Sequence, residues 1–196
     1  MMLGVIASSG ARSAKAKTKA AGLPELLLQS LVDVGEKVPD GARIISVAVP
    51  WVAIMAEIAK DPKVLFHFAK APRRFEEFIA GAYERAGYSV ILTPQRGDQG
   101  RDVIASKDGY GSVRILDQAK AYSAGRLIGH SELREMLGVL SADLNASKAV
   151  ISTTSSFEPG VLSSPEFSKF RPYRLELRDG HALSAWLEEL NRMKVD

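Results

Sequence analysis

Apolar residues recur at helical spacing between Pro72 and Ala86, and Gly87 follows at the position typical of a helix C-terminal cap. Beyond it, runs rich in β-branched and apolar residues alternate with two further helical patterns. The predicted strands cover residues 88–93, 102–106, 112–120, 148–154 and 173–177, and the later helices cover 131–143 and 181–193. This order predicts an α/β fold with a mixed β-sheet flanked by helices.

The pattern over residues 23–70 is less regular and predicts a short, mainly helical N-terminal segment. Leucines follow Pro24 at helical spacing, and residues 39–41 interrupt them. A short β-rich run over residues 44–49 precedes a helix that begins near Pro50. Residues 1–22, rich in Ala, Ser, Gly and Lys, are expected to form a flexible basic tail.

Composition narrows the classes of protein. The chain has 196 residues, of which 46% are hydrophobic and 25% charged, as in soluble globular domains. It contains no cysteine, which excludes disulfides and thiolate metal sites. The apolar runs are too short to cross a membrane, so we expect a cytoplasmic protein without a membrane partner. The net charge of +3 comes from the first part of the chain and is compatible with binding a polyanion.

The polar residues that stand out lie on two consecutive predicted strands. Asp102 opens one strand, and Gln118 and Lys120 lie two positions apart on the next. Strand side chains alternate between faces, so Gln118 and Lys120 share a face and would meet Asp102 if the strands pair. A carboxylate, an amide oxygen and a lysine suit a hard divalent cation beside a scissile phosphate. The pattern predicts a metal-dependent nuclease.

Five short motifs in the same order resemble the PD-(D/E)xK nuclease superfamily, and in particular the Mrr-type restriction endonuclease catalytic domain. The resemblance covers about residues 71–190. Its motifs are Phe75-Glu76-Glu77-Phe78-Ile79 with Gly87-Tyr88-Ser89-Val90, Leu92-Thr93-Pro94 leading to Asp102, Gln118-Ala119-Lys120 with Tyr122, Ser152-Thr153-Thr154-Ser155-Ser156-Phe157, and Asp179-Gly180 before Leu183 and Trp186.

The resemblance implies a restriction-endonuclease-like αβββαβ core in residues 71–196, preceded by the helical segment 23–70. It implies a Mg²⁺-dependent endonuclease that hydrolyses DNA phosphodiester bonds in restriction of the type IV Mrr-like kind or a related DNA defence, with Mn²⁺ as the other cation and a homodimer as one assembly. Asp102, Gln118 and Glu76 would hold the cation, and Lys120 would lie at the phosphate. Tyr122 and Thr154 would contact the DNA backbone.

The sequence also departs from the family pattern. Gln118 replaces a carboxylate, which is common in the family, and Ala121 stands where a basic residue is frequent. Asp117 occupies a position that is usually apolar. It could face a helix with a partner such as Arg114, or act as a substitute acid if the strand were bulged.

Each candidate also has an ordinary structural interpretation. Asp102 could cap a turn, Lys120 could lie in solvent, and Gln118 could make a sheet hydrogen bond. Glu76 could be a first-turn glutamate favoured by the helix dipole, Glu77 is expected at the surface, and Asp98 is expected to hold its loop. Three other functions stay open: a nuclease fold that binds DNA or protein without cutting, a structure-specific DNA repair nuclease, and a small-molecule α/β enzyme.

Overall fold

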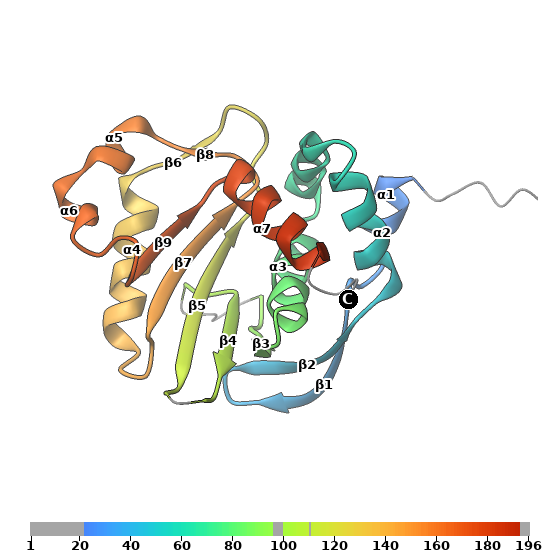
Figure 1. Ribbon diagram of the computed structural model, residues 1–196, viewed down its shortest axis with the longest axis horizontal. Coiled ribbons are helices and arrows are strands. Elements are labelled where there is room, and N and C mark those ends of the chain that lie inside the picture. Colours follow the sequence, from blue (N-terminus) through green and yellow to red (C-terminus); the bar gives the residue numbers. More distant parts are fainter. Residues whose placement is uncertain (1–21, 96–99, 110, 193–196) are drawn as a thin grey trace, which may run out of the picture.

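A twisted sheet runs through the centre of the molecule, with helices on both of its faces (Figure 1). The structure, a computed structural model, describes residues 22–95, 100–109 and 111–192. In these residues the main sheet has seven strands in the order β1-β2-β3-β4-β5-β7-β9. They are β1 (Val32–Val38), β2 (Gly41–Val47), β3 (Ser89–Leu92), β4 (Val103–Lys107), β5 (Val113–Lys120), β7 (Lys148–Thr153) and β9 (Leu175–Arg178). Neighbours from β1 to β5 are antiparallel, whereas β5, β7 and β9 are parallel.

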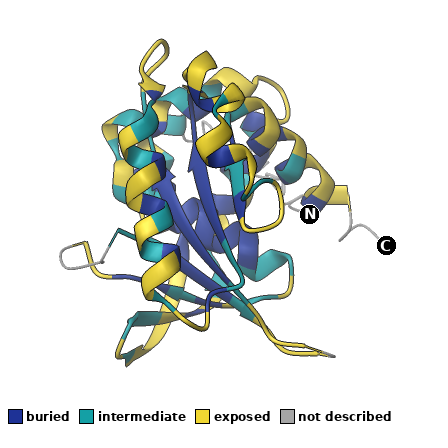
Figure 2. Ribbon diagram, turned by 90° about the vertical axis from the view of Figure 1, so that its left-hand side faces the viewer, coloured by how far each residue is buried: buried dark blue, intermediate teal, exposed yellow. Residues whose placement is uncertain are grey.

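Two hydrophobic layers hold the sheet between helices. One face packs against α2 (Val49–Ile58), the 3₁₀ helix η1 (Pro62–Lys70), α3 (Pro72–Arg85) and α7 (Gly180–Arg192). The other packs against α4 (His130–Ala142), α5 (Pro159–Ser163) and α6 (Pro165–Ser168). A small parallel pair, β6 (Leu127–Ile128) and β8 (Ser156–Phe157), lies at the carboxyl ends of β5 and β7. Figure 2 shows the central strands buried beneath these helices.

The order of elements after residue 71 confirms the predicted mixed α/β fold, and the helix α3 shows why. Its apolar stripe buries Phe75, Phe78 and Ile79 completely, and Phe78 stacks on Trp51 of α2 with ring centroids 5.2 Å apart. Gly87 follows the helix with a φ of 83°, a conformation that glycine adopts without strain. The local signals and the burial therefore agree in this part of the chain.

The N-terminal segment differs from the prediction, because it contains a β-hairpin. The expected helix after Pro24 is limited to α1 (Leu23–Leu26), and β1 and β2 form the hairpin that follows. Strand β2 pairs with β3, with Ala42 opposite Leu92, so the hairpin extends the sheet at its edge. Residues 44–47 of the expected strand belong to β2, and α2 matches the expected helix near Pro50. The pairing of β2 with β3 joins residues that are far apart in the sequence, and the local spacing of apolar residues does not predict such a contact.

Glu77 was expected at the surface, but it is buried with only 6% of its surface exposed. Its carboxylate forms an ion pair with Arg74 and accepts a hydrogen bond of 2.8 Å from the backbone N–H of Leu31. The side chain thereby fixes the start of the hairpin on α3. Buried carboxylates need such partners, because an unpaired charge in a core is strongly unfavourable.

None of the helices within residues 22–95, 100–109 and 111–192 is long and apolar enough to cross a lipid bilayer. The basic tail expected over residues 1–22 lies almost wholly outside the described residues, as does Asp98. The proposed division of the chain at residues 22 and 70 stays a prediction.

Candidate active site

The antiparallel pairing of β4 and β5 places Asp102 beside Gln118 and Lys120. Val103 lies opposite Asp117, so the start of β4 meets the end of β5. The backbone N–H of Asp102 donates to the carbonyl of Asp117 at 2.9 Å. The Asp102 carboxylate accepts the backbone N–H of Ala119 at 2.7 Å. Asp102 is therefore held against the residue that separates Gln118 from Lys120.

Gln118 is 6% exposed, and its amide oxygen Oε1 finds no hydrogen-bond donor among the described residues. Buried polar atoms are nearly always paired, and one left without a partner destabilises the fold by roughly 1–3 kcal/mol. An amide oxygen in this state, beside a carboxylate, has the chemistry of a ligand for a hard cation such as Mg²⁺. The donor set at the start of β4 and end of β5 therefore fits a divalent cation.

Lys120 is half-buried at the end of β5, on the face of the sheet that α4 covers. Its positive charge acts on Glu132 in the first turn of α4. Partial burial alone would raise the pKa of Glu132. Hydrogen bonds from Ser131 and from the Gly129 N–H, together with Lys120, lower this pKa below its usual value. The lysine thus lies in the electrostatic field of a carboxylate that stays ionised.

Glu76 lies on α3 and reaches the same loop through an intermediate arginine. Arg73 donates to the Glu76 carboxylate at 2.6 Å and to the carbonyl of Thr93 at 2.9 Å. The Thr93 hydroxyl in turn donates to the carbonyl of Asp102 at 3.0 Å. Within the part of the chain that the structure describes, no three His, Asp or Glu side chains lie close enough to hold one metal ion. Asp102 and Gln118 are therefore brought together, and Glu76 is linked to them through Arg73 and Thr93.

The two candidate DNA contacts, Tyr122 and Thr154, are tied to each other. The Thr154 hydroxyl accepts the backbone N–H of Tyr122 at 2.8 Å and donates to its carbonyl at 2.6 Å. Thr154 is almost fully buried, whereas Tyr122 is half-buried beneath the guanidinium of Arg126, which lies 3.8 Å from its ring centroid. Thr154 therefore braces the loop after Lys120, and Tyr122 and Arg126 remain accessible on that loop.

Asp117 points away from this site and faces helix α3, as one of the two explanations from sequence expected, but its arginine partner is Arg178 and the substitute-acid explanation is wrong. Its carboxylate accepts hydrogen bonds from Tyr83 at 2.8 Å and Ser152 at 2.9 Å, and it pairs with Arg178 at 3.7 Å. Arg114 is not a partner. Strands β4 and β5 pair without a bulge from Val103 to Lys107, so Asp117 cannot turn toward Asp102 as a substitute acid.

Arg114 pairs instead with Asp143, at 3.1 Å, and with Asp40, at 3.3 Å. These contacts link β5 to the end of α4 and to the β1–β2 turn. Arg114, which the sequence suggested as a partner for Asp117, therefore forms its ion pairs elsewhere.

Burial dominates the titration of the Asp117 group. It raises the pKa of Asp117 to about 6, although Arg178, Tyr83 and Ser152 act to lower it. Burial also raises the pKa of the Tyr83 phenol, and the nearby Asp117 charge adds to this rise. Arg178 reaches the pair from β9, where Trp186 covers its guanidinium at 4.0 Å and Glu176 accepts from it at 2.7 Å. The group therefore lies inside the core, where the carboxylate is paired through Oδ2 while Oδ1 has no hydrogen-bond donor among the described residues.

Sequence reasoning missed Glu132, Arg73 and Arg178. Glu132 follows Gly129 at the third helical position, which is a capping signal that could have marked it as a side chain turned back to the start of α4. Arg73 lies three residues before Glu76, which is the spacing of a helix ion pair. Nothing in the local sequence marks Arg178 as the partner of Asp117, since 61 positions separate them and only the parallel sheet joins them.

Comparison with known proteins shows the family of the chain. The family model Mrr_cat, described as a restriction endonuclease, matches residues 69–187, which is more than half of the chain. The chain belongs to this restriction endonuclease family. The family match includes α3, the β4–β5 hairpin and the start of α7, and therefore all the candidate residues. No curated protein sequence matches the chain.

One solved restriction endonuclease, FokI, shares the fold, and two others are similar to part of the chain. FokI aligns with a TM-score of 0.52 at 13% identity over 75% of this chain and 32% of its own. MspJI, in complex with a 27-mer oligonucleotide, aligns with a TM-score of 0.47 and a sequence identity of 17%, and the alignment covers 77% of this chain and 37% of the MspJI chain. AspBHI, a DNA modification-dependent restriction endonuclease, aligns with a TM-score of 0.49 and a sequence identity of 17%, and the alignment covers 84% of this chain and 44% of the AspBHI chain. The chain spans less than half the length of each of these enzymes.

Proposed function

We propose that this chain is a metal-dependent DNA endonuclease of the Mrr-like restriction type. The observation that carries the proposal is the juxtaposition of the Asp102 carboxylate with the unpaired amide oxygen of Gln118, which precedes Lys120 by two positions on β5. The family membership supports hydrolysis of DNA as the reaction.

In this proposal Asp102 and Gln118 supply oxygen ligands to Mg²⁺, with Mn²⁺ as the other candidate, and Glu76 approaches from α3. The cation, when bound, would stabilise negative charge on the phosphate and activate water for attack. Asp102 is pre-positioned for this role by its hydrogen bond to Ala119, so the carboxylate need not reorganise. Gln118 is pre-positioned by burial between neighbouring strands.

Lys120 would place a positive charge at the non-bridging phosphate oxygens, where charge develops during the displacement. Glu132, in the first turn of α4, interacts electrostatically with this lysine. Tyr122 and Arg126, on the loop that follows, would contact the DNA backbone beside the reacting phosphate. These residues supply positions and charge, and none of them reads a base.

The deciding experiment compares wild-type protein with Asp102→Asn on supercoiled plasmid, with Mg²⁺ or with EDTA. Asparagine still accepts the Ala119 N–H, so the fold is kept while the anionic ligand is lost. We expect Mg²⁺-dependent nicking or linearisation that falls by about 10²-fold or more in Asp102→Asn. Asp108→Asn, at an exposed aspartate of the adjacent turn, is the matched control and should cut normally.

Three results would contradict the proposal in different ways. Cleavage in EDTA would exclude the metal, and full cleavage by Asp102→Asn would exclude the site. DNA binding without any cleavage would favour the binding-only function. The same assay tests the proposed homodimer, because two sites related by a two-fold axis convert plasmid to the linear form more readily at higher protein concentration.

A further inference from the structure

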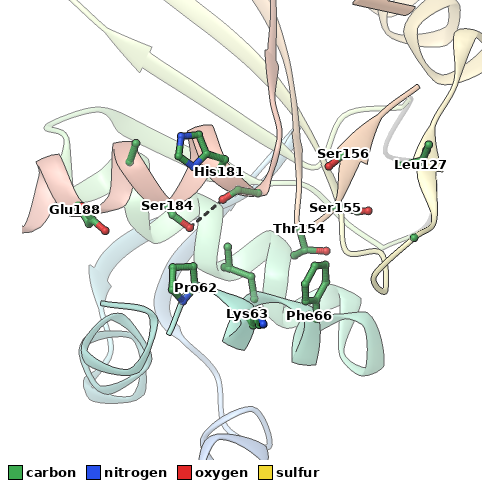
Figure 3. A pocket seen from close by; sticks show the side chains of 14 residues that line it. Pro62, Lys63, Phe66, Leu127, Thr154, Ser155, Ser156, His181, Ser184 and Glu188 are labelled. Atoms are coloured by element: carbon green, nitrogen blue, oxygen red, sulfur yellow. Dashed lines mark hydrogen bonds between the residues drawn. The ribbon is translucent and has the colours of Figure 1, made fainter. Parts of the chain in front are cut away.

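A pocket of about 610 Å³ opens at the carboxyl ends of β5 and β7, between η1 and the start of α7 (Figure 3). Its size is within the range of pockets that bind small molecules or single nucleotides. Pro62, Leu65 and Phe66 line it from η1, and Leu127 lines it from β6. Hydroxyl groups of the loop after β7 face it as well, from Ser155 and Ser156.

The pocket is continuous with the backbone that carries Lys120. The Thr153 hydroxyl donates to the carbonyl of Lys120 at 2.8 Å, and the Thr154 N–H donates to the same carbonyl at 3.3 Å. Thr154 then forms part of the pocket wall. Gly180 allows α7 to begin directly against this wall, because a Cβ there would lie 2.8 Å from the Thr154 carbonyl. The loop that follows Lys120 also lines the pocket, through Gly125, so the pocket opens at the end of the sheet where Lys120 lies.

Phe66 is the feature that points to a planar ligand. Its neighbour Phe68 packs against Phe75 and Phe78, with ring centroids 5.4 and 5.1 Å apart. Phe66, only half-buried, forms no such pair with any described ring, and it lies in the pocket wall instead. Lys63 is exposed on the same helix at the pocket mouth. An aromatic face, hydroxyl groups and a nearby cation are what a nucleobase and its phosphate require.

We propose that this pocket receives one unpaired nucleotide of the DNA strand whose phosphate lies at Lys120. The base stacks on Phe66, its edge faces Ser155 and Ser156, and Lys63 faces its phosphate. The inference rests on the proposed nuclease function and narrows its substrate to DNA with an unpaired or extruded nucleotide beside the cleavage site. Because base stacking on an aromatic residue tolerates all four bases, this recognition selects DNA structure over sequence.

The test measures binding in EDTA, so that cleavage does not interfere, by fluorescence anisotropy with labelled DNA. Three duplexes are compared: fully paired, with a one-nucleotide bulge, and with the same bulge made abasic. We expect the bulged duplex to bind about tenfold more tightly than the other two. Phe66→Leu, which keeps apolar bulk without the ring, should remove this preference, whereas Phe170→Leu on the far side of the sheet should keep it. Lys63→Gln should weaken binding to the bulged duplex more than Lys60→Gln does.

Each of the alternative binding results contradicts a specific part of the pocket proposal or of the nuclease proposal. Equal binding of the three duplexes by the wild type overturns the pocket proposal and leaves the nuclease proposal standing. A preference for the bulge that persists in Phe66→Leu overturns the assignment to this pocket. If a free nucleoside monophosphate binds in a Phe66-dependent manner while bulged DNA gains nothing, the ligand is a free nucleotide and the DNA form is wrong. Failure to bind any DNA contradicts the nuclease proposal itself.

Discussion

Strand β5 carries polar side chains on both of its faces, and the fold treats the two sets differently. On the α3 and α7 face, Asp117 is enclosed by Tyr83, Ser152 and Arg178, with no exposed surface. On the α4 face, Gln118 keeps a buried oxygen without a donor among the described residues, and Lys120 remains half-exposed. Each of the two adjacent residues has one buried oxygen without a donor among the described residues, but only the Asp117 carboxylate is balanced by a buried cation, whereas Gln118 lies at the end of the strand where Lys120 is half-exposed.

The difference separates structural charge from charge available for chemistry. The Asp117 carboxylate forms its hydrogen bonds within the core. Two hydroxyl groups donate to one of its oxygens, and the Arg178 cation balances its charge. In the other group, the buried amide oxygen of Gln118 has no donor among the described residues, and this lack of a partner does not stabilise the folded protein. Such uncompensated polar atoms are typical of binding and catalytic sites. Both residues are aspartates, so residue type alone would not have distinguished the structural Asp117 from the candidate site residue Asp102.

The largest effect should come from breaking the enclosed group. Arg178→Met leaves the Asp117 carboxylate buried without its cation, and we expect the free energy of unfolding to fall by about 3–5 kcal/mol. Arg134→Met removes an arginine from the exposed pair with Glu166 and should change stability little. Urea denaturation followed by circular dichroism measures both. A small effect of Arg178→Met would show that the enclosed group is not a stabilising unit.

Removing the lysine from the open group should affect cleavage and leave folding nearly intact. Lys120→Ala is expected to lower the rate of plasmid cleavage by about 10²–10³-fold, because the charge opposite the phosphate is lost. Lys107→Ala, at the other end of the β4–β5 hairpin, has the same change in charge and should retain the rate. If both variants cut equally well, Lys120 has no role in the reaction and the comparison fails.

A smaller effect concerns pH and belongs to Asp117 alone. Burial raises its pKa from the usual 3.8 to about 6, so the folded protein holds a proton that the unfolded chain has released in this interval. Its contribution to stability is complete below about pH 4 and is lost as the pH rises through about 6. Relative to Asp117→Asn, the wild type should lose about 1.5 kcal/mol between pH 5 and pH 7.

Denaturation curves of the two proteins at several pH values give this difference directly. Other groups titrate equally in both proteins, so they cancel in the comparison. A difference that stays flat with pH, or that grows in favour of the wild type as pH rises, would contradict the raised pKa and would place an ionised, stabilising carboxylate at Asp117.

Sequence patterns predicted the part of the fold in which local preference and burial agree. Helix α3, the β4–β5 hairpin with its Asp108-Gly109 turn, and the parallel strands β7 and β9 lie close to their expected positions. The convergence of Asp102 with Gln118 and Lys120 follows from strand alternation plus one antiparallel pairing, both of which are local. The β1–β2 hairpin was missed, and it joins the main sheet through the pairing of β2 with β3, about 50 residues later.

The sequence by itself determined which residues could meet at the end of one hairpin and which family the chain resembles, because both depend on short spacings. Tertiary structure decided the fate of the polar residues. It enclosed Asp117 with an arginine from β9, buried Glu77 against the backbone of Leu31, and set Phe66 in a pocket beside Lys120. These outcomes depend on which distant elements pack together, and burial changes the free energy of a charge far more than any local preference does.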